Sequence, residues 1–206
     1  MDDFINKIAD RLRQPLPGAE AQYKLAHVSR HHAPTPPDDV RQAAVLALFY
    51  LKADDWHIVL IERESSNPND RHGGQIGLPG GKYEAGDASL QDTALREAEE
   101  EVGVDASRVE VLGALTELYI PVSNFQVNPY VGFTNYTPNF SPQIEEVRAI
   151  LEVPFRVFQQ PEALRSTDLR ITPNITLRNV PYFAVQDKIV WGATAMMLSE
   201  LIEALR

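Results

Sequence analysis

Apolar positions recur along the chain with two different spacings, which predict where helices and strands form. Residues 4–12 have apolar side chains at helical spacing, and the prolines that follow predict the end of this helix. Residues 43–50 are a continuous apolar run typical of a central strand, and residues 56–63 predict a second strand joined to it in a hairpin. Later runs predict strands at 109–115, 127–134 and 147–154, a hairpin of 177–185 with 188–192, and a closing helix over 193–205.

Prolines also mark a boundary near the N-terminus. Residues 31–39 are proline-rich and predict a linker, so we expect an N-terminal helix with its linker over 1–37 and a main domain over 38–206. The apolar face of the N-terminal helix packs either on the main domain or on the partner subunit of a homodimer, and the sequence leaves both open. His31 and His32 are more typical of a solvated loop than of a metal site. Strands and helices alternate too irregularly for a doubly wound sheet, so an α/β fold of another kind is expected.

Composition then excludes several classes of protein. Of 206 residues, 44% are hydrophobic, which is enough for a core. The 29 acidic and 19 basic residues give a net charge of −10, which argues against nucleic acid bound through a basic patch. There is no cysteine, hence no disulfide and no thiolate zinc site. With no apolar run of membrane length and no secretory pattern at the N-terminus, we expect a soluble cytoplasmic protein without a membrane partner.

The acidic charge is concentrated in one place. Residues 84–101 contain seven acids and one base, a net charge of −6, and six of the eleven glycines lie just before or within this segment. Residues 88–102 predict a helix that Gly103 ends. At about 100° per residue, one face of this helix is shared by Glu97, Glu100 and Glu101. Glu99 points away from that face.

Three carboxylates at this spacing repel one another, and they lie at the helix end where the dipole favours cations. Local conflicts of this kind are typical of functional sites, and a hard cation such as Mg²⁺ or Mn²⁺ would resolve this one. The alternative is a solvated acidic face on which Arg96 contacts Glu100. The glycine-rich segment 77–87 favours a composite site, because glycine lets the backbone approach the helix closely.

These residues resemble the Nudix hydrolase signature. Gly81 begins the match, and Arg96-Glu97-Ala98-Glu99-Glu100-Glu101-Val102-Gly103-Val104 completes it. Two departures lie between: Asp87 replaces the middle glutamate, and eight residues rather than seven separate it from Arg96. Asp87 is also a residue type that commonly caps a helix N-terminus, which is its alternative role.

Both departures are similar to the coenzyme A diphosphatase branch of the family, which tends to have Asp at this point and Thr-Ala-Leu before Arg-Glu. This chain has Thr93-Ala94-Leu95 there. The segment from His72 to Gly81, HGGQIGLPGG, also resembles a motif of that branch, with Leu78 in place of the usual aromatic residue and Arg71 displaced by one position.

The resemblance implies an α/β/α sandwich around a mixed β-sheet. It also implies hydrolysis of a nucleoside diphosphate linked to another group. For the coenzyme A branch, the products are adenosine 3′,5′-bisphosphate and 4′-phosphopantetheine. Two alternatives stay open: a Nudix hydrolase of another derivative such as ADP-ribose, and a Nudix domain that only binds a nucleotide as a regulator.

The resemblance and the acidic face together assign roles to individual residues. Mg²⁺ or Mn²⁺ is expected on Glu97, Glu100 and Glu101. Arg96 orients these carboxylates and the glycine loop. The general base is expected among the glutamates of the signature or at the downstream acids Glu145 and Glu146, of which we prefer Glu146. Substrate contacts are expected from His72, Gln75, Gly80, Gly81 and Arg63.

Overall fold

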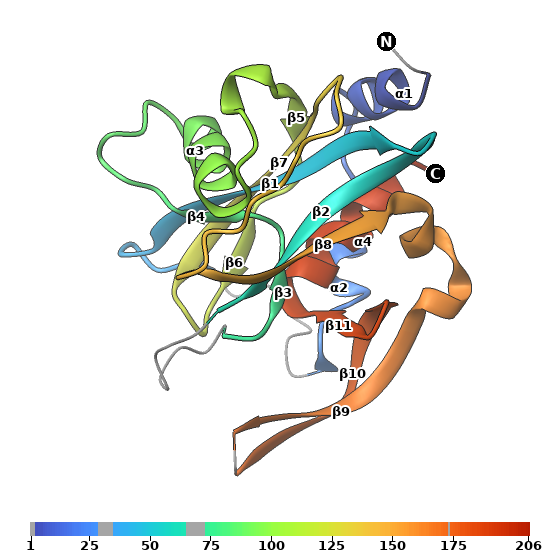
Figure 1. Cartoon of the computed structure of the whole chain (residues 1–206). Coiled ribbons are helices and arrows are strands. Elements are labelled where there is room, and N and C mark those ends of the chain that lie inside the picture. The colour runs from blue at the N-terminus through green and yellow to red at the C-terminus, as the bar shows by residue number, and fades with distance from the viewer. Residues whose placement is uncertain (1–2, 29–34, 65–72, 173) are drawn as a thin grey trace.

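The computed structural model describes residues 3–28, 35–64, 73–172 and 174–206. Figure 1 shows a large twisted sheet with α3 on one face and α2 and α4 on the other. The α-helices in these ranges are α1 (Asp3–Leu12), α2 (Gly18–Tyr23), α3 (Leu90–Val102) and α4 (Gly192–Ala204). Short 3-10 helices span Ala106–Arg108, Phe155–Gln159 and Pro161–Ala163. The predicted α/β/α sandwich is confirmed.

The large sheet is mixed. Its strands are β1 (Arg41–Lys52), β2 (Asp55–Arg63), β3 (Ile76–Gly77), β4 (Gly80–Lys82), β5 (Glu110–Ala114), β6 (Leu118–Ile120), β7 (Phe125–Phe133) and β8 (Val147–Pro154). The main order is β3-β2-β1-β7-β5, with β4 paired to β1, β6 to β7 and β8 to β2. β1 runs parallel to β7 and antiparallel to β2 and β4. The glycine-rich segment therefore enters the sheet as β4 beside β1.

Side chains of β1 alternate between two hydrophobic clusters, one on each face of the sheet. Ala44, Leu46 and Leu48 pack with Ala94 and Ala98 of α3. The opposite face of β1 packs with α1, α2 and α4. Burial of apolar surface on both faces, at about 25 cal/mol per Å², holds α3 against the sheet and so fixes where its acidic face lies.

The N-terminal helix belongs to the same core. Ile5 and Ile8 of α1 are fully buried in the cluster that also contains Phe49 and Phe155. The helix therefore packs on its own chain, which was one of the two expected arrangements. The six-residue α2 was not predicted, because it is too short to show a helical period.

A second sheet follows β8. It contains β9 (Leu164–Thr172), β10 (Ile175–Val185) and β11 (Lys188–Trp191) in the order β11-β10-β9, all antiparallel. The hairpin of β10 with β11 confirms the prediction for that region. β9 was not predicted, because most of its side chains are exposed and its sequence lacks an apolar face. In Figure 1, β9 and the outer part of β10 project from the body of the molecule.

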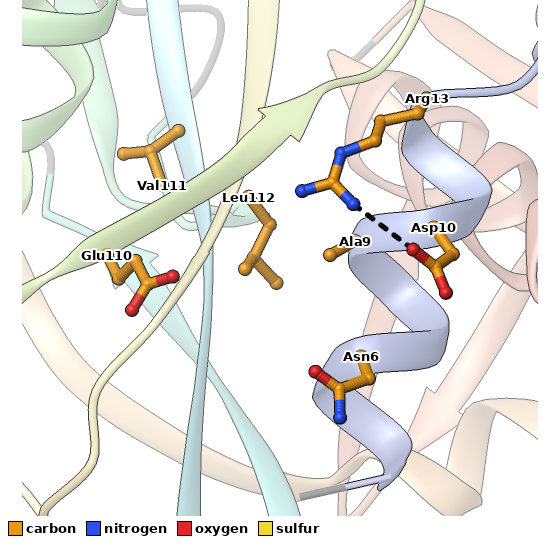
Figure 2. Close-up of a pocket in the computed structure, with 7 residues that line it drawn as sticks. All are labelled: Asn6, Ala9, Asp10, Arg13, Glu110, Val111 and Leu112. Atoms are coloured by element: carbon orange, nitrogen blue, oxygen red, sulfur yellow. Dashed lines mark hydrogen bonds and ion pairs between the residues drawn. The ribbon is translucent and has the colours of Figure 1, made fainter. Parts of the chain in front are cut away.

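None of the helices in the described part of the chain has the length and hydropathy of a membrane span. A surface pocket of about 400 Å³ lies between α1 and β5 (Figure 2), lined by Asn6, Ala9, Asp10, Arg13, Glu110, Val111 and Leu112. None of the predicted site residues lines this pocket, and Arg13 in it pairs with Asp10 at 3.1 Å.

Candidate active site

Local signals fix both ends of α3. Ser89 caps the N-terminus: its hydroxyl accepts a hydrogen bond from the backbone N–H of Asp92 at 3.2 Å and donates to the Asp92 carboxylate at 2.8 Å. Gly103 ends the helix in the left-handed conformation, with φ of 70°, and its N–H donates to the carbonyl of Glu99. A serine three residues before an acid is a recognised signal in the sequence for the start of a helix.

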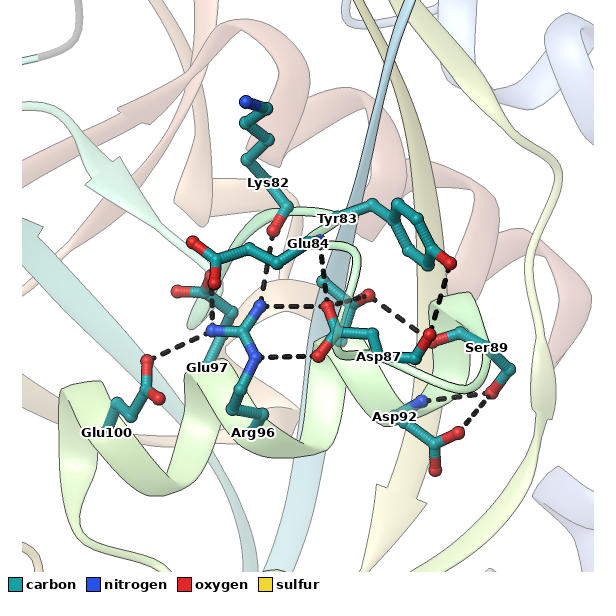
Figure 3. A network of polar contacts seen from close by, with 10 residues as sticks. Lys82, Tyr83, Glu84, Asp87, Ser89, Asp92, Arg96, Glu97 and Glu100 are labelled. Atoms are coloured by element: carbon teal, nitrogen blue, oxygen red, sulfur yellow. Dashed lines mark hydrogen bonds and ion pairs between the residues drawn. The ribbon is translucent and has the colours of Figure 1, made fainter.

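Arg96 lies at the centre of a polar network that joins the glycine loop to α3 (Figure 3). Its guanidinium donates to both oxygens of Asp87, at 2.8 and 3.0 Å, and to the carbonyl of Lys82 at 3.2 Å. Its third nitrogen donates to Glu97 at 2.9 Å and to Glu100 at 3.1 Å. The expected orienting role of Arg96 therefore has a geometric basis.

Asp87 is an anchor for Arg96 and not the cap of α3. Besides the guanidinium, its carboxylate accepts hydrogen bonds from the backbone N–H of Glu84 at 3.0 Å and the hydroxyl of Thr93 at 2.8 Å. The hydrogen bonds from Arg96 lower the pKa of Asp87 far below its ordinary value, so this carboxylate stays ionised. The alternative that Asp87 caps the helix is wrong, because Ser89 takes that position.

Glu101 is almost fully buried, with 1% of its side chain exposed. It accepts a hydrogen bond from the backbone N–H of Gly80 at 2.7 Å and pairs with Arg63 at 3.3 Å. Burial, together with the charges of Glu97 and Glu146, raises the pKa of Glu101 to about 7 against the opposing effect of Gly80 and Arg63. A cation in contact with this carboxylate would favour its ionised form.

The carboxylate of Glu97 lies against Gly81. Burial raises the pKa of Glu97, and the charges of Glu100 and Glu146 add to that effect, while Arg96 opposes it. Glu100, by contrast, has 57% of its side chain exposed. The three glutamates thus differ in environment: Glu97 and Glu101 are desolvated beside the glycine loop, and Glu100 faces solvent.

Glu146 comes to this site from a different part of the chain. The segment before it is fastened to the C-terminal end of α3, where the N–H groups of Ser141 and Gln143 donate to the carbonyls of Val102 and Glu101. The charge of the Glu146 carboxylate is among the causes that raise the pKa of both Glu97 and Glu101. Glu145, the other candidate, is not among the main causes for either group.

The other predicted substrate contacts lie in part beside these acids. The backbone N–H of Arg63 donates to the backbone carbonyl of Gln75 at 3.0 Å. The backbone of Gln75 therefore lies beside the end of β2, where the side chain of Arg63 pairs with Glu101. Gly80 and Gly81 contact Glu101 and Glu97 as described. His72 and Arg71, like His31 and His32, lie outside the described residues.

The charges at this site do not balance. Five acids meet two bases here, the bases being Arg63 and Arg96 and the acids Asp87, Glu97, Glu100, Glu101 and Glu146. Within the described ranges no three of these side chains are already arranged around a common ion position, since the guanidinium of Arg96 stands between Glu97 and Glu100. The excess of oxygen ligands and negative charge fits a hard divalent cation.

Comparison with known proteins agrees with this geometry. A model of the NUDIX domain matches residues 40–174. A relative in Yersinia enterocolitica, an uncharacterized Nudix hydrolase NudL, is 34% identical over 206 residues that cover 98% of this chain and 92% of the relative. Nudix hydrolase 22 of Arabidopsis thaliana, a chloroplastic protein, is 35% identical over 164 residues, or 77% of this chain and 53% of that relative.

A solved structure shares the fold. The MutT/nudix family protein of Enterococcus faecalis superposes with a TM-score of 0.52 at 15% sequence identity, over 91% of this chain and 74% of that one. This likeness shows that the chain has the α/β/α sandwich fold of that protein. The chain belongs to the Nudix family, and it is a pyrophosphohydrolase that acts on a nucleoside diphosphate derivative.

Proposed function

We propose that the protein cleaves the pyrophosphate of coenzyme A or its derivatives, giving adenosine 3′,5′-bisphosphate and 4′-phosphopantetheine. The observation that carries this proposal is the position of the segment that resembles the coenzyme A branch. Its last two residues, Gly80 and Gly81, lie against the carboxylates of Glu101 and Glu97. The segment therefore ends at the reacting centre, and its earlier residues would contact the part of the substrate beyond the pyrophosphate.

Two further features of that branch have a structural role here. The hydroxyl of Thr93 donates a hydrogen bond to the carboxylate of Asp87, and the guanidinium of Arg96 donates to both oxygens of that carboxylate. The extra residue between Asp87 and Arg96 is thus accommodated without loss of the contact between them. This supports the proposal that the two departures from the general signature are features of a working site.

Glu97, Glu100 and Glu101 would hold Mg²⁺ or Mn²⁺. The buried Glu101 and the half-buried Glu97 lie against the glycine loop, while the exposed Glu100 would turn from Arg96 toward an ion. The bound ion would supply neutralisation of the negative charge on the pyrophosphate. Buried acids with raised pKa values, crowded by like charges, are the donor set that such an ion stabilises.

The side chains of the protein carry out the other part of the reaction, which is the activation of the attacking water. Water adds to one phosphorus, the bridging P–O bond breaks, and the leaving phosphate takes the bonding electron pair. We assign the carboxylate of Glu146 to accept the proton of that water, because it is exposed and lies near Glu97 and Glu101. Arg96 holds the glycine loop, through Asp87, and the carboxylate of Glu97 in position.

The test is a comparison of substrates. Purified protein is incubated with coenzyme A or with ADP-ribose, in Mg²⁺ or Mn²⁺, and the products are identified by mass. We expect faster turnover of coenzyme A and the two products named above. Preferred cleavage of ADP-ribose, or equal rates for both, would overturn the assignment of coenzyme A and leave the Nudix hydrolase activity in place.

A further inference from the structure

Thr93, near the start of α3, is fully buried and faces the loop that precedes the helix. Its hydroxyl oxygen lies 2.8 Å from Oδ2 of Asp87 and 3.3 Å from the backbone carbonyl oxygen of Ser89. A hydroxyl has a single hydrogen to donate, and a hydrogen bond to an ionised acceptor is both shorter and stronger than one to a carbonyl. The hydroxyl of Thr93 therefore donates to the carboxylate of Asp87 and not to the helix backbone.

This hydrogen bond completes the set of donors around Asp87. Oδ1 accepts from Nε of Arg96 at 2.8 Å, and Oδ2 accepts from Nη2 of Arg96 and from the backbone N–H of Glu84, each at 3.0 Å, as well as from Thr93. A carboxylate has about four acceptor positions, so all of them are used. Only 5% of the Asp87 side chain is exposed, so loss of one donor would leave a buried acceptor position unfilled.

Thr93 and Arg96 hold the carboxylate of Asp87 from two points on one helix face, since they are three residues apart in α3. The two side chains differ in stiffness. The hydroxyl of a threonine is attached directly to the branched Cβ, whose torsion is restricted, whereas the guanidinium ends a long and flexible chain. The contact with Thr93 therefore fixes where the carboxylate stands relative to the helix, and the guanidinium of Arg96 aligns with that carboxylate.

The guanidinium of Arg96 connects this position to the acids of the site (Figure 3). Its Nη1 donates to Oε1 of Glu97 at 2.9 Å and to Oε2 of Glu100 at 3.1 Å. The carboxylate of Glu97 also lies directly against Gly81. A change in the direction of the guanidinium would thus move the Glu97 carboxylate relative to the glycine loop.

We propose that Thr93 is a positioning residue for the hydrolysis. Its hydroxyl fixes the carboxylate of Asp87, and that carboxylate fixes the guanidinium of Arg96. The guanidinium then sets the position of the Glu97 carboxylate, so Thr93 acts on the reaction without contact with the substrate. The proposal rests on the proposed role of Glu97 in holding a divalent ion, and not on which nucleoside diphosphate derivative is cleaved.

Thr93→Val and Thr93→Ser separate the hydroxyl from the packing of the side chain. Valine keeps the shape and removes the donor, whereas serine keeps the donor and removes a buried methyl group. With whichever of coenzyme A and ADP-ribose the wild type hydrolyses faster, we expect Thr93→Val to lower kcat by about 10-fold with little change in KM. Thr93→Ser should keep kcat near that of the wild type. The reverse order would overturn the proposal, because it is the order expected of a residue that only fills space.

Ser199→Ala is the control for the loss of a buried hydroxyl elsewhere. Ser199 lies in α4 on the opposite face of the sheet, and its hydroxyl donates to the backbone carbonyl of Ala21 at 2.7 Å. This variant should lower the melting temperature and leave kcat unchanged. An equal fall of kcat in Ser199→Ala and Thr93→Val would assign the effect to stability, and the positioning role would be refuted.

A double variant tests the route through Asp87. Adding Thr93→Val to Asp87→Ala should lower kcat little further, because the hydroxyl then has no carboxylate to hold. A second full loss of about 10-fold would show that Thr93 acts by another route. Circular dichroism checks that each variant is folded, and the comparison of valine with serine stands even if Asp87→Ala does not fold.

Binding of Mg²⁺, measured by calorimetry without substrate, gives a readout that is independent of turnover. We expect the dissociation constant for Mg²⁺ to rise by about 10-fold in Thr93→Val and to stay unchanged in Thr93→Ser, since residues that orient metal ligands have effects of that size. Unchanged Mg²⁺ affinity and kcat in Thr93→Val would overturn the role of Thr93 and leave the metal site in place. Absence of Mg²⁺ binding by the wild type would instead refute the proposed metal site, and the order of kcat in the two variants would still decide the role of Thr93.

Discussion

The carboxylate of Glu97 lies directly on Gly81: a Cβ atom built on that glycine would be 2.4 Å from Cδ of Glu97. No side chain fits in that space, so glycine at this position decides where the carboxylate stands. The neighbouring Gly80 is constrained as tightly, because a Cβ there would lie 2.4 Å from the carbonyl oxygen of Ala44.

Gly81→Ala is therefore expected to displace Glu97 and lower kcat by about 100-fold, since small displacements of positioned groups have effects of that size. Gly86→Ala is the matched control in the same loop, because a Cβ there meets nothing within 4 Å. Steady-state kinetics and circular dichroism compare the two variants. Full activity in Gly81→Ala would contradict the role given to this contact.

Glu101→Gln is expected to lower kcat/KM by about 100-fold or more while the protein remains folded. The amide keeps the volume of the buried side chain and an oxygen for the N–H of Gly80. Glu99→Gln, on the face of α3 away from the site, should leave activity unchanged. Mg²⁺ should raise the melting temperature of Glu99→Gln as it does that of wild type, and a full Mg²⁺ response in Glu101→Gln would argue against this metal ligand.

Glu101 also predicts a dependence of stability on pH in metal-free protein. Its pKa is raised from 4.5 to about 7, so the folded state binds this proton more tightly than the unfolded chain. The stability it contributes is complete below pH 4.5 and is lost as the pH rises through about 7, a change of about 3 kcal/mol. The free energy of unfolding, measured in urea with a chelator at pH 5 and pH 8, should fall more in wild type than in Glu101→Gln.

Asp87→Asn is expected to destabilise the protein by about 2 kcal/mol, because it removes the most deeply buried of the three carboxylates that pair with the guanidinium of Arg96. The lowered pKa of Asp87 means that this stability is present above its ordinary pKa and lost in acid as the pH falls through the lowered value. Activity should fall as well, since Arg96 also holds Glu97. Asp92→Asn, which changes a carboxylate near the same helix start but not on Arg96, is the comparison, with urea unfolding as the measurement.

Glu146→Gln is expected to lower kcat by 100-fold or more, about the contribution of a positioned general base, with little change in KM. Glu145→Gln, one residue earlier, should behave as wild type. Equal loss in both variants would instead point to a structural effect of the loop.

Much of the secondary structure was predictable from the sequence, because local periodicity records it. The helix of α3, its end at Gly103 and the central strands β1 and β2 all follow from apolar spacing and turn residues. The elements that were missed are short or exposed. α2 has six residues, β6 has three, and β9 has mostly exposed side chains, so none of them shows a clear period.

The sequence alone also determined the family and the shared face of Glu97, Glu100 and Glu101, since a helix places residues three and four apart on one side. Only the tertiary structure decided how those acids differ. Glu101 is buried because β4 lies over it, Asp87 anchors Arg96 because the loop folds back, and Glu146 arrives from a segment fastened to the end of α3. Burial and long-range pairing set the charge state of each group, and neither can be read from local spacing.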